Sequence, residues 1–161
     1  MGVSSFTQEF SSPISPSRMF KALILDSNIL IPKLLPQFIQ SVEIIQGVDG
    51  APGTIEQLNF TQASNLKYVR NRIEELDKEK LMCKYTLIEG YPLGDKLDSI
   101  AYEVKFEAAN DGGCICKITS NYITIGDFTI SEDEIKDGKD KSIGIYKVVE
   151  AYLLDNPQVY A

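Results

Sequence analysis

The 161-residue chain contains no histidine. Histidine is the commonest general base and a member of the Ser-His-Asp and Cys-His arrangements, so any catalysis here would rest on carboxylate, lysine or tyrosine side chains. Cysteine is also scarce, with three residues at positions 83, 114 and 116. With so few thiols and no imidazole, no metal site is predicted, and no cofactor is expected. The odd number of cysteines favours free thiols.

Positive charge is scarce as well. The chain has 16 Lys and Arg against 23 Asp and Glu, a formal net charge of −7. Binding to DNA or to anionic membranes depends on clustered cations, and the most basic segment, at 67–80, is interleaved with acids. Neither DNA nor a membrane is therefore expected as a partner.

Targeting signals are missing from the sequence. The N-terminal residues lack the apolar segment of a secretory signal, and Phe6 stands where a myristoylation signal has Ser or Thr. No apolar run approaches membrane-spanning length. These absences predict a cytoplasmic protein, and the length predicts a single domain over residues 1–161.

The hydrophobic periodicity predicts an α+β fold. Ser15 followed by Pro16 starts the first of two short helices, which are arranged in a V, and the capping box from Ser131 to Glu134 starts a long helix that ends near Asp155. Strands are predicted over 3–10, 41–46, 54–60, 66–76, 81–89, 98–106 and 114–124. Short turns between most strands imply a curved antiparallel sheet with the long helix against its concave face.

The glycine-rich segment GVDGAPGT at 47–54 raises the question of a phosphate-binding loop. A P-loop needs Lys after its last glycine and a helix beyond it, whereas Thr54 follows here and a strand comes next. We therefore interpret Gly47, Gly50 and Gly53 as supplying positive φ angles in a connection between two strands.

Several segments together resemble the plant pathogenesis-related class 10 proteins, the family of the major birch pollen allergen. They are the opening MGV, the glycine-rich loop, RMFKALILDSNILIPKLLPQ, KYTLIEGYPLGDKL, ITSNYITIGDFTISEDEIKDGK and VVEAYLLDNP. The resemblance covers the whole chain and departs from the family in a loop one residue longer, with Val48 as the added residue. It implies a helix-grip fold: a seven-stranded antiparallel sheet that grips the long helix around a large internal cavity. Such proteins bind flavonoids, cytokinins, brassinosteroids and other hydrophobic or amphipathic plant metabolites there.

The sequence offers its own indication of a cavity. The second half of the long helix carries a continuous apolar stripe, but the first half contains Gly138 and Gly144, whose small size leaves space unfilled. Tyr85, Tyr102 and Tyr122 share the predicted inner face of the sheet, where their hydroxyls need partners. The alternatives are that the glycines lie on an exposed face and that the hydroxyls reach water at the sheet margins.

The resemblance also implies a set of ligand contacts, carried over position by position. They are Ile24, Asn28, Leu30, Ile39, Phe60, Leu66, Tyr68, Cys83, Tyr85, Leu87, Ile100, Tyr102, Ser120, Tyr122, Gly138, Lys141, Ser142 and Ile145. Two of these depart from the family: Cys83 replaces a tyrosine and widens the pocket, and Lys141 replaces an apolar or small residue. The Lys141 ammonium either extends to solvent or meets an acidic or phenolic ligand.

Enzymatic alternatives remain on the same fold. The positions of a reported ribonuclease site correspond to Glu56, Asp98, Glu150 and Tyr152. Glu56 reverses the charge of a lysine that would stabilise phosphate, which weakens that hypothesis. An alkaloid-forming enzyme would need an inward lysine, for which Lys141 beside Tyr102 or Tyr85 is the candidate. The gate loops of hormone receptors that regulate a phosphatase are not found.

The sequence thus predicts a cytoplasmic plant protein, induced in defence or development, that carries or stores hydrophobic small molecules without chemistry of its own. Its partners would be amphipathic metabolites or hormones, and it would act as a monomer or weak homodimer.

Overall fold

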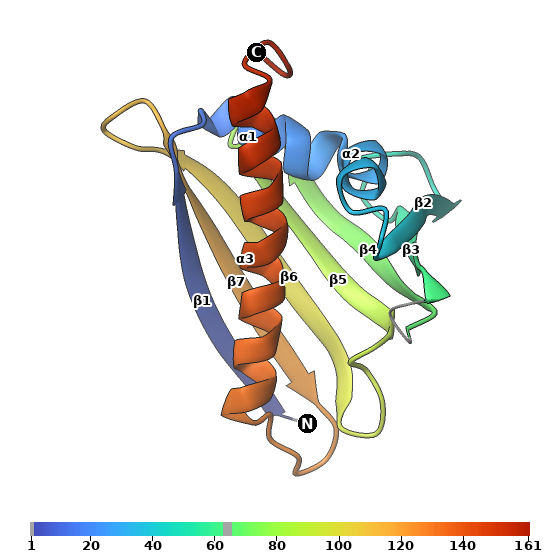
Figure 1. Cartoon of the computed structure of the whole chain (residues 1–161). Coiled ribbons are helices and arrows are strands. Elements are labelled where there is room, and N and C mark those ends of the chain that lie inside the picture. Colours follow the sequence, from blue (N-terminus) through green and yellow to red (C-terminus); the bar gives the residue numbers. More distant parts are fainter. Residues whose placement is uncertain (1, 63–65) are drawn as a thin grey trace.

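The computed structural model describes residues 2–62 and 66–161, and Figure 1 shows a sheet wrapped around one long helix. The elements in chain order are β1 (Gly2–Ser12), α1 (Pro16–Phe20), the π-helical turn η1 (Lys21–Leu25), α2 (Ser27–Leu34), β2 (Ile39–Gln46), β3 (Ile55–Phe60), β4 (Tyr68–Asp77), β5 (Met82–Gly90), β6 (Leu97–Ala108), β7 (Cys114–Thr124) and α3 (Glu132–Asp155). This order confirms the predicted α+β fold.

The seven strands form one antiparallel sheet in the order β1-β7-β6-β5-β4-β3-β2. From β2 to β7, each strand pairs with its neighbours in the chain, because short connections join them. The first strand instead pairs with the last one, with Gly2 opposite Thr124 and Ser12 opposite Cys114. The sheet curves, and α3 crosses its concave face (Figure 1).

Local signals in the sequence start the helices where predicted. The Ser15 hydroxyl accepts a hydrogen bond from the Arg18 amide at 3.4 Å, and Pro16 occupies the first turn of α1. The Ser131 hydroxyl accepts from the Glu134 amide at 3.2 Å and donates to the Glu134 carboxylate at 3.0 Å, so the capping box of α3 is formed.

The glycine-rich loop connects β2 to β3, as predicted. Gly47, Gly50 and Gly53 have φ angles of +90°, +78° and +87°. At Gly47 a side chain would also collide with Thr54, because a Cβ there would lie 2.8 Å from the Thr54 hydroxyl. Thr54 is fully buried and donates to the Val48 carbonyl, while Val48 itself is 72% exposed. The loop is therefore a structural connection closed by Thr54.

The main hydrophobic core lies at one end of α3. Val149 and Leu153 of α3 are fully buried in a cluster that includes Met19 and Phe20 of α1. The Phe20 ring meets Phe106 of β6 edge-on, with 5.8 Å between ring centroids. In the first half of α3 only Ile135 is buried. The long helix is therefore tightly packed along its C-terminal half alone.

Arg18 fixes the C-terminal end of α3 to α1. Its Nε donates to the Val159 carbonyl at 3.0 Å, and its Nη2 donates to the carbonyls of Leu153 and Asn156 at 3.1 and 3.0 Å. Carbonyls at a helix C-terminus lack partners within the helix, so a guanidinium there satisfies groups that would otherwise need water.

We expect Arg18→Ala to lower the free energy of unfolding by about 2–4 kcal/mol, because three charge-assisted hydrogen bonds are lost at a part-buried site. Urea denaturation measures this change. Arg72→Ala is the matched control: Arg72 pairs with Glu74 on the exposed sheet surface, where a pair contributes less than about 1 kcal/mol. Equal losses in the two variants would contradict the anchoring role of Arg18.

Candidate ligand-binding site

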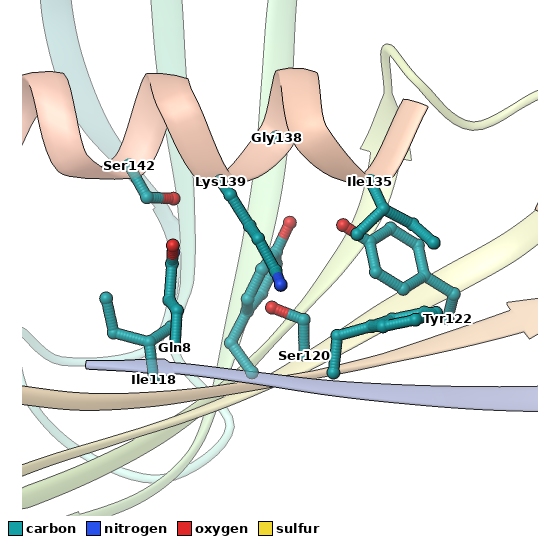
Figure 2. Close-up of a pocket in the computed structure, with 10 residues that line it drawn as sticks. Gln8, Ile118, Ser120, Tyr122, Ile135, Gly138, Lys139 and Ser142 are labelled. Carbon is teal, nitrogen blue, oxygen red and sulfur yellow. The ribbon is translucent and has the colours of Figure 1, made fainter. Parts of the chain in front are cut away.

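A small pocket opens between the first half of α3 and strands β1, β6 and β7 (Figure 2). It is lined by Phe6, Gln8, Tyr102, Ile118, Ser120, Tyr122, Ile135, Gly138, Lys139 and Ser142. Its volume is about 20 Å³, which is room for a water molecule. The sequence led us to expect a cavity large enough for a polycyclic metabolite, and this pocket alone is far smaller than that.

Two periodicities place the lining residues. On α3, Ile135, Gly138, Lys139 and Ser142 follow the i, i+3, i+4, i+7 spacing of one helix face. On the sheet, alternate residues of β1 and β7 point toward the helix. A Cβ at Gly138 would lie 3.2 Å from the Tyr122 hydroxyl, so the absence of a side chain there keeps space open beside that hydroxyl.

The pocket is rich in polar groups without protein partners. Within residues 2–62 and 66–161, no hydrogen bond reaches the side chains of Gln8, Ser120 or Ser142, nor the Tyr122 hydroxyl. Among the described residues that line the pocket, Lys139 alone is charged, and its ammonium lies over the Phe6 ring, 6.0 Å from the centroid. These groups remain available to water or to a ligand.

Tyr102 lines the pocket and also contacts the next strand toward the middle of the sheet. Its ring stacks on Tyr85 of β5, with 5.0 Å between centroids and 26° between ring planes. Burial raises the pKa values of both hydroxyls well above the ordinary tyrosine value, so both phenols stay protonated at neutral pH. Both rings nevertheless keep accessible surface.

Other side chains on the inner face of the sheet also keep accessible surface. Leu58 and Phe60 of β3 and Ile145 of α3 pack against the core clusters but are only partly buried. Apolar side chains in the centre of a filled core lose nearly all their accessible surface. The inner face of the sheet is therefore incompletely covered by the protein.

Glu56 places a carboxylate on this inner face. It alternates with Gln57 and Asn59, which belong to the outer face, and shares its side of β3 with Leu58 and Phe60. In the part of the chain that the structure describes, no hydrogen bond or ion pair reaches Glu56. Burial, with a smaller effect of Asp49, raises the pKa of Glu56.

The predicted ligand contacts other than Tyr68 and Lys141 lie in three environments. Tyr102, Ser120, Tyr122, Gly138 and Ser142 line the pocket. Leu30, Ile39, Cys83, Leu87 and Ile100 are buried in the core. Ile24, Asn28, Phe60, Leu66, Tyr85 and Ile145 are partly buried. As ligand contacts, all of these remain predictions.

Lys141 points away from the pocket. Its ammonium pairs with Asp137 at 3.1 Å and lies over the Tyr91 ring, 5.4 Å from the centroid, and its side chain is 59% exposed. Of the two alternatives for this lysine, the structure places the side chain in solvent. Gly144 also lies on the exposed face of α3, with nothing near its Cβ position, so it does not open space beneath the helix.

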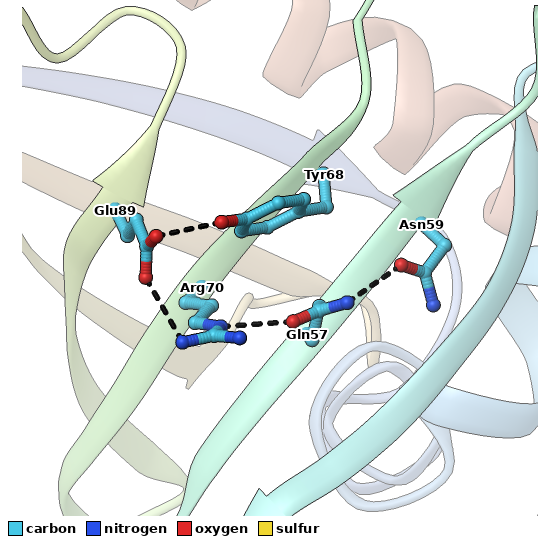
Figure 3. A network of polar contacts seen from close by, with 5 residues as sticks. All are labelled: Gln57, Asn59, Tyr68, Arg70 and Glu89. Atoms are coloured by element: carbon cyan, nitrogen blue, oxygen red, sulfur yellow. Dashed lines mark hydrogen bonds and ion pairs between the residues drawn. The ribbon is translucent and has the colours of Figure 1, made fainter.

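Tyr68 also lies outside the interior. Figure 3 shows it in a polar network on the outer face of the sheet, where its hydroxyl donates to Glu89 at 2.6 Å. Arg70 joins Glu89 at 3.1 Å to Gln57 at 2.8 Å in the same network. Val69, the next residue after Tyr68, is buried on the inner face, so the inward position on β4 is one residue further along.

The four residues at the ribonuclease positions are not assembled. Glu56 lies on the inner face of the sheet, whereas Asp98 is exposed and accepts a hydrogen bond from Ser99. The Tyr152 hydroxyl accepts a hydrogen bond from Lys33 of α2 at 3.1 Å. Across residues 2–62 and 66–161, no hydrogen bond or ion pair joins any two of Glu56, Asp98, Glu150 and Tyr152. Tyr152 thus contacts a neighbouring helix.

Five lining residues were not among the predicted ligand contacts: Phe6, Gln8, Ile118, Ile135 and Lys139. The helical spacing from Ile135 to Ser142 contained the signal for Lys139, because residues 135, 138, 139 and 142 share a face. The alternation along β1 likewise pointed to Phe6 and Gln8.

A curved antiparallel sheet that grips a long C-terminal helix defines a helix-grip fold. Comparison with known sequences identifies its family: residues 1–156 match the profile described as "Pathogenesis-related protein Bet v 1 family", and the chain belongs to that family. No helix in residues 2–62 or 66–161 is both long and apolar enough to cross a bilayer.

Individual relatives agree with this assignment. Pathogenesis-related protein STH-2 from Solanum tuberosum is 47% identical over 161 residues, which is 100% of both chains. The crystal structure of Ara h 8.0201 superposes with a TM-score of 0.86 at 35% identity, covering 96% of this chain and 100% of that one. Norcoclaurine synthase from Thalictrum flavum has a TM-score of 0.79 at 17% identity over 96% of this chain and 88% of its own. This last likeness shows the fold alone.

We expect Glu56→Gln to be more stable than the parent at pH 7. The raised pKa means that the fold disfavours the charged carboxylate, and the amide removes that charge. The gain disappears below the ordinary pKa of 4.5, where the carboxyl is protonated in both the folded and the unfolded state. Urea midpoints between pH 4 and pH 8 measure this, with the exposed Glu43→Gln as control; a variant less stable than the parent at pH 7 would contradict it.

Proposed function

We propose that the protein carries or stores hydrophobic or amphipathic plant metabolites, with flavonoids and cytokinins as the leading classes. It works in the cytoplasm in defence or development, as a monomer or weak homodimer, and performs no chemistry of its own. Membership of the pathogenesis-related family supports the defence-related, ligand-binding part of this proposal.

The incompletely covered inner face is the observation that carries the proposal. Leu58, Phe60, Tyr85 and Ile145 pack against the core cluster between sheet and helix but are only partly buried. A guest molecule that covers this surface gains roughly 25 cal/mol for each Å² of apolar area removed from water. A ligand of suitable shape would therefore bind by covering this apolar surface.

Entry of such a ligand requires movement, because the pocket encloses only about 20 Å³. The first half of α3 is the element best able to move, since Ile135 is its one buried residue, whereas the core and Arg18 fix the second half. Local opening free energies are lowest where few buried apolar contacts hold an element. Ligand uptake therefore displaces the N-terminal half of α3 and the side chains beneath it.

The polar groups of the interior favour a ligand with a few oxygen or nitrogen atoms on an apolar frame. Tyr85, Tyr102 and Tyr122 present phenolic groups that both donate and accept hydrogen bonds. A mostly apolar site with a few convergent polar groups is typical of small-molecule binding.

The enzymatic alternatives receive less support from the geometry. The lysine proposed for alkaloid-type chemistry, Lys141, pairs with Asp137 outside the pocket rather than with Tyr102 or Tyr85. The likeness to norcoclaurine synthase rests on the fold, which many activities can share. At the ribonuclease positions, Glu56 adds negative charge where a phosphate would need a cation.

We expect Ile145→Trp to weaken the binding of quercetin and kinetin by at least about tenfold, which is about 1.4 kcal/mol, in titration calorimetry. Ile145 packs against the core cluster and is only partly buried, so the larger indole would occupy the region between helix and sheet that a ligand needs. Leu154→Trp is the matched control: Leu154 lies on the same helix but is 52% exposed, so a larger side chain there faces solvent.

Two outcomes would count against the proposal. One is the absence of measurable heat for every flavonoid and cytokinin tested with the parent protein. The other is an equal effect of Ile145→Trp and Leu154→Trp, which would place the ligand outside the space between helix and sheet.

A further inference from the structure

We propose that the pocket beside Lys139 is a subsite for an anionic headgroup, a carboxylate or sulfonate, on an aromatic ligand whose apolar part lies deeper between sheet and helix. This inference rests on the proposed carrier function and names the class of ligand that the site prefers. Lys139 is the positioning cation, and the hydroxyls around it complete the subsite.

The charge of the pocket is not neutralised by the protein. Lys139 is half-buried, and its neighbour in the pocket is the Phe6 ring rather than a carboxylate. Of the acids nearest in sequence, Asp137 pairs with Lys141 and Asp140 is exposed. Glu134 accepts from Ser131 at 3.0 Å, and its charge, after burial, is the second cause that raises the pKa of Tyr122 at the edge of the pocket. Within the described residues, no acid lines the pocket or pairs with Lys139. The pocket therefore complements a negative charge.

Hydrogen-bonding groups lie along the pocket on both sides of the Lys139 ammonium. Figure 2 shows the Lys139 side chain extending from α3 toward the sheet, with its ammonium directed at Ser120. Ser142 extends from the helix above Gln8, and the Tyr122 hydroxyl points up toward Ile135 and Gly138. An ammonium with hydroxyl groups nearby is a favourable acceptor site for an oxyanion, because charge-assisted hydrogen bonds are about twice as strong as neutral ones.

The size and position of the pocket assign it to a headgroup rather than to a whole ligand. A space of about 20 Å³ has room for one water-sized group, so with the movement of α3 proposed above it accepts a small headgroup and not a whole ligand. Its wall, Tyr102, stacks on Tyr85, so an aromatic frame attached to the headgroup continues along this pair toward the uncovered inner face. A ligand in this orientation is anchored by charge at one end and by ring contacts at the other.

A matched pair of fluorescent probes tests the charge preference. N-phenyl-1-naphthylamine is neutral, and 8-anilinonaphthalene-1-sulfonate has the same aromatic frame with one sulfonate. In fluorescence titrations of the full chain we expect the sulfonate probe to bind about tenfold more tightly than the neutral one. The difference should shrink as salt screens the half-buried ammonium.

Variants then show which residue causes the preference for the sulfonate probe. Lys139→Met removes the charge and keeps the length of the side chain, so we expect it to weaken the sulfonate probe about tenfold and leave the neutral probe unchanged. Lys139→Arg keeps the charge and should retain the preference. Lys141→Met is the matched control: it removes a charge two residues away on the exposed face of the same helix. Circular dichroism verifies that all three variants fold.

The outcomes separate the two proposals. Tight binding of both probes with no preference, or equal effects of Lys139→Met and Lys141→Met, overturns the anionic subsite and leaves the carrier function standing. No binding of either probe overturns the anionic subsite, and the calorimetry with flavonoids and cytokinins then decides the carrier function. Loss of the sulfonate preference in Lys139→Met alone supports the subsite.

Discussion

The structure depends on the anchoring of one long helix at one end. Val149 and Leu153 bury the C-terminal half of α3 in the core, and the Arg18 guanidinium ties its last carbonyls to α1. The N-terminal half is buried at Ile135 alone. Because stability is concentrated at the anchored end, the other end can lie over the sheet without filling the space beneath it.

This uneven packing determines where polar chemistry can occur. At the anchored end, apolar side chains and the thiols of Cys114 and Cys116 fill the interior. At the N-terminal end of α3, hydroxyls and the Lys139 ammonium reach between helix and sheet with no hydrogen bond or ion pair to residues 2–62 or 66–161. Polar groups can remain in such a place because water or a ligand satisfies them, whereas in the filled core they would be costly.

Much of the fold followed from local pattern. The Ser15-Pro16 start, the capping box at Ser131 and the alternation along β6 and β7 each depend on residues close together in the sequence, and all three were predicted correctly. The site was harder to predict, because its geometry depends on which face of α3 each residue occupies. Lys139 and Lys141 are two positions apart on a helix, which puts them about 200° apart around its axis, since a turn takes about 3.6 residues. Carrying positions over from the family selected Lys141, and the structure places Lys139 in the pocket.

The same sensitivity applies to strands. Tyr68 was expected inside, but the register of β4 puts Val69 there and sends Tyr68 to the outer network, because a shift of one residue exchanges the faces of a strand. The sequence by itself determined the class of fold, the order of its elements, the structural role of the glycine-rich loop and the family. Only the tertiary structure decided the phase of α3 and β4, the anchoring by Arg18 and the small size of the pocket, because these depend on how segments distant in the sequence pack against each other.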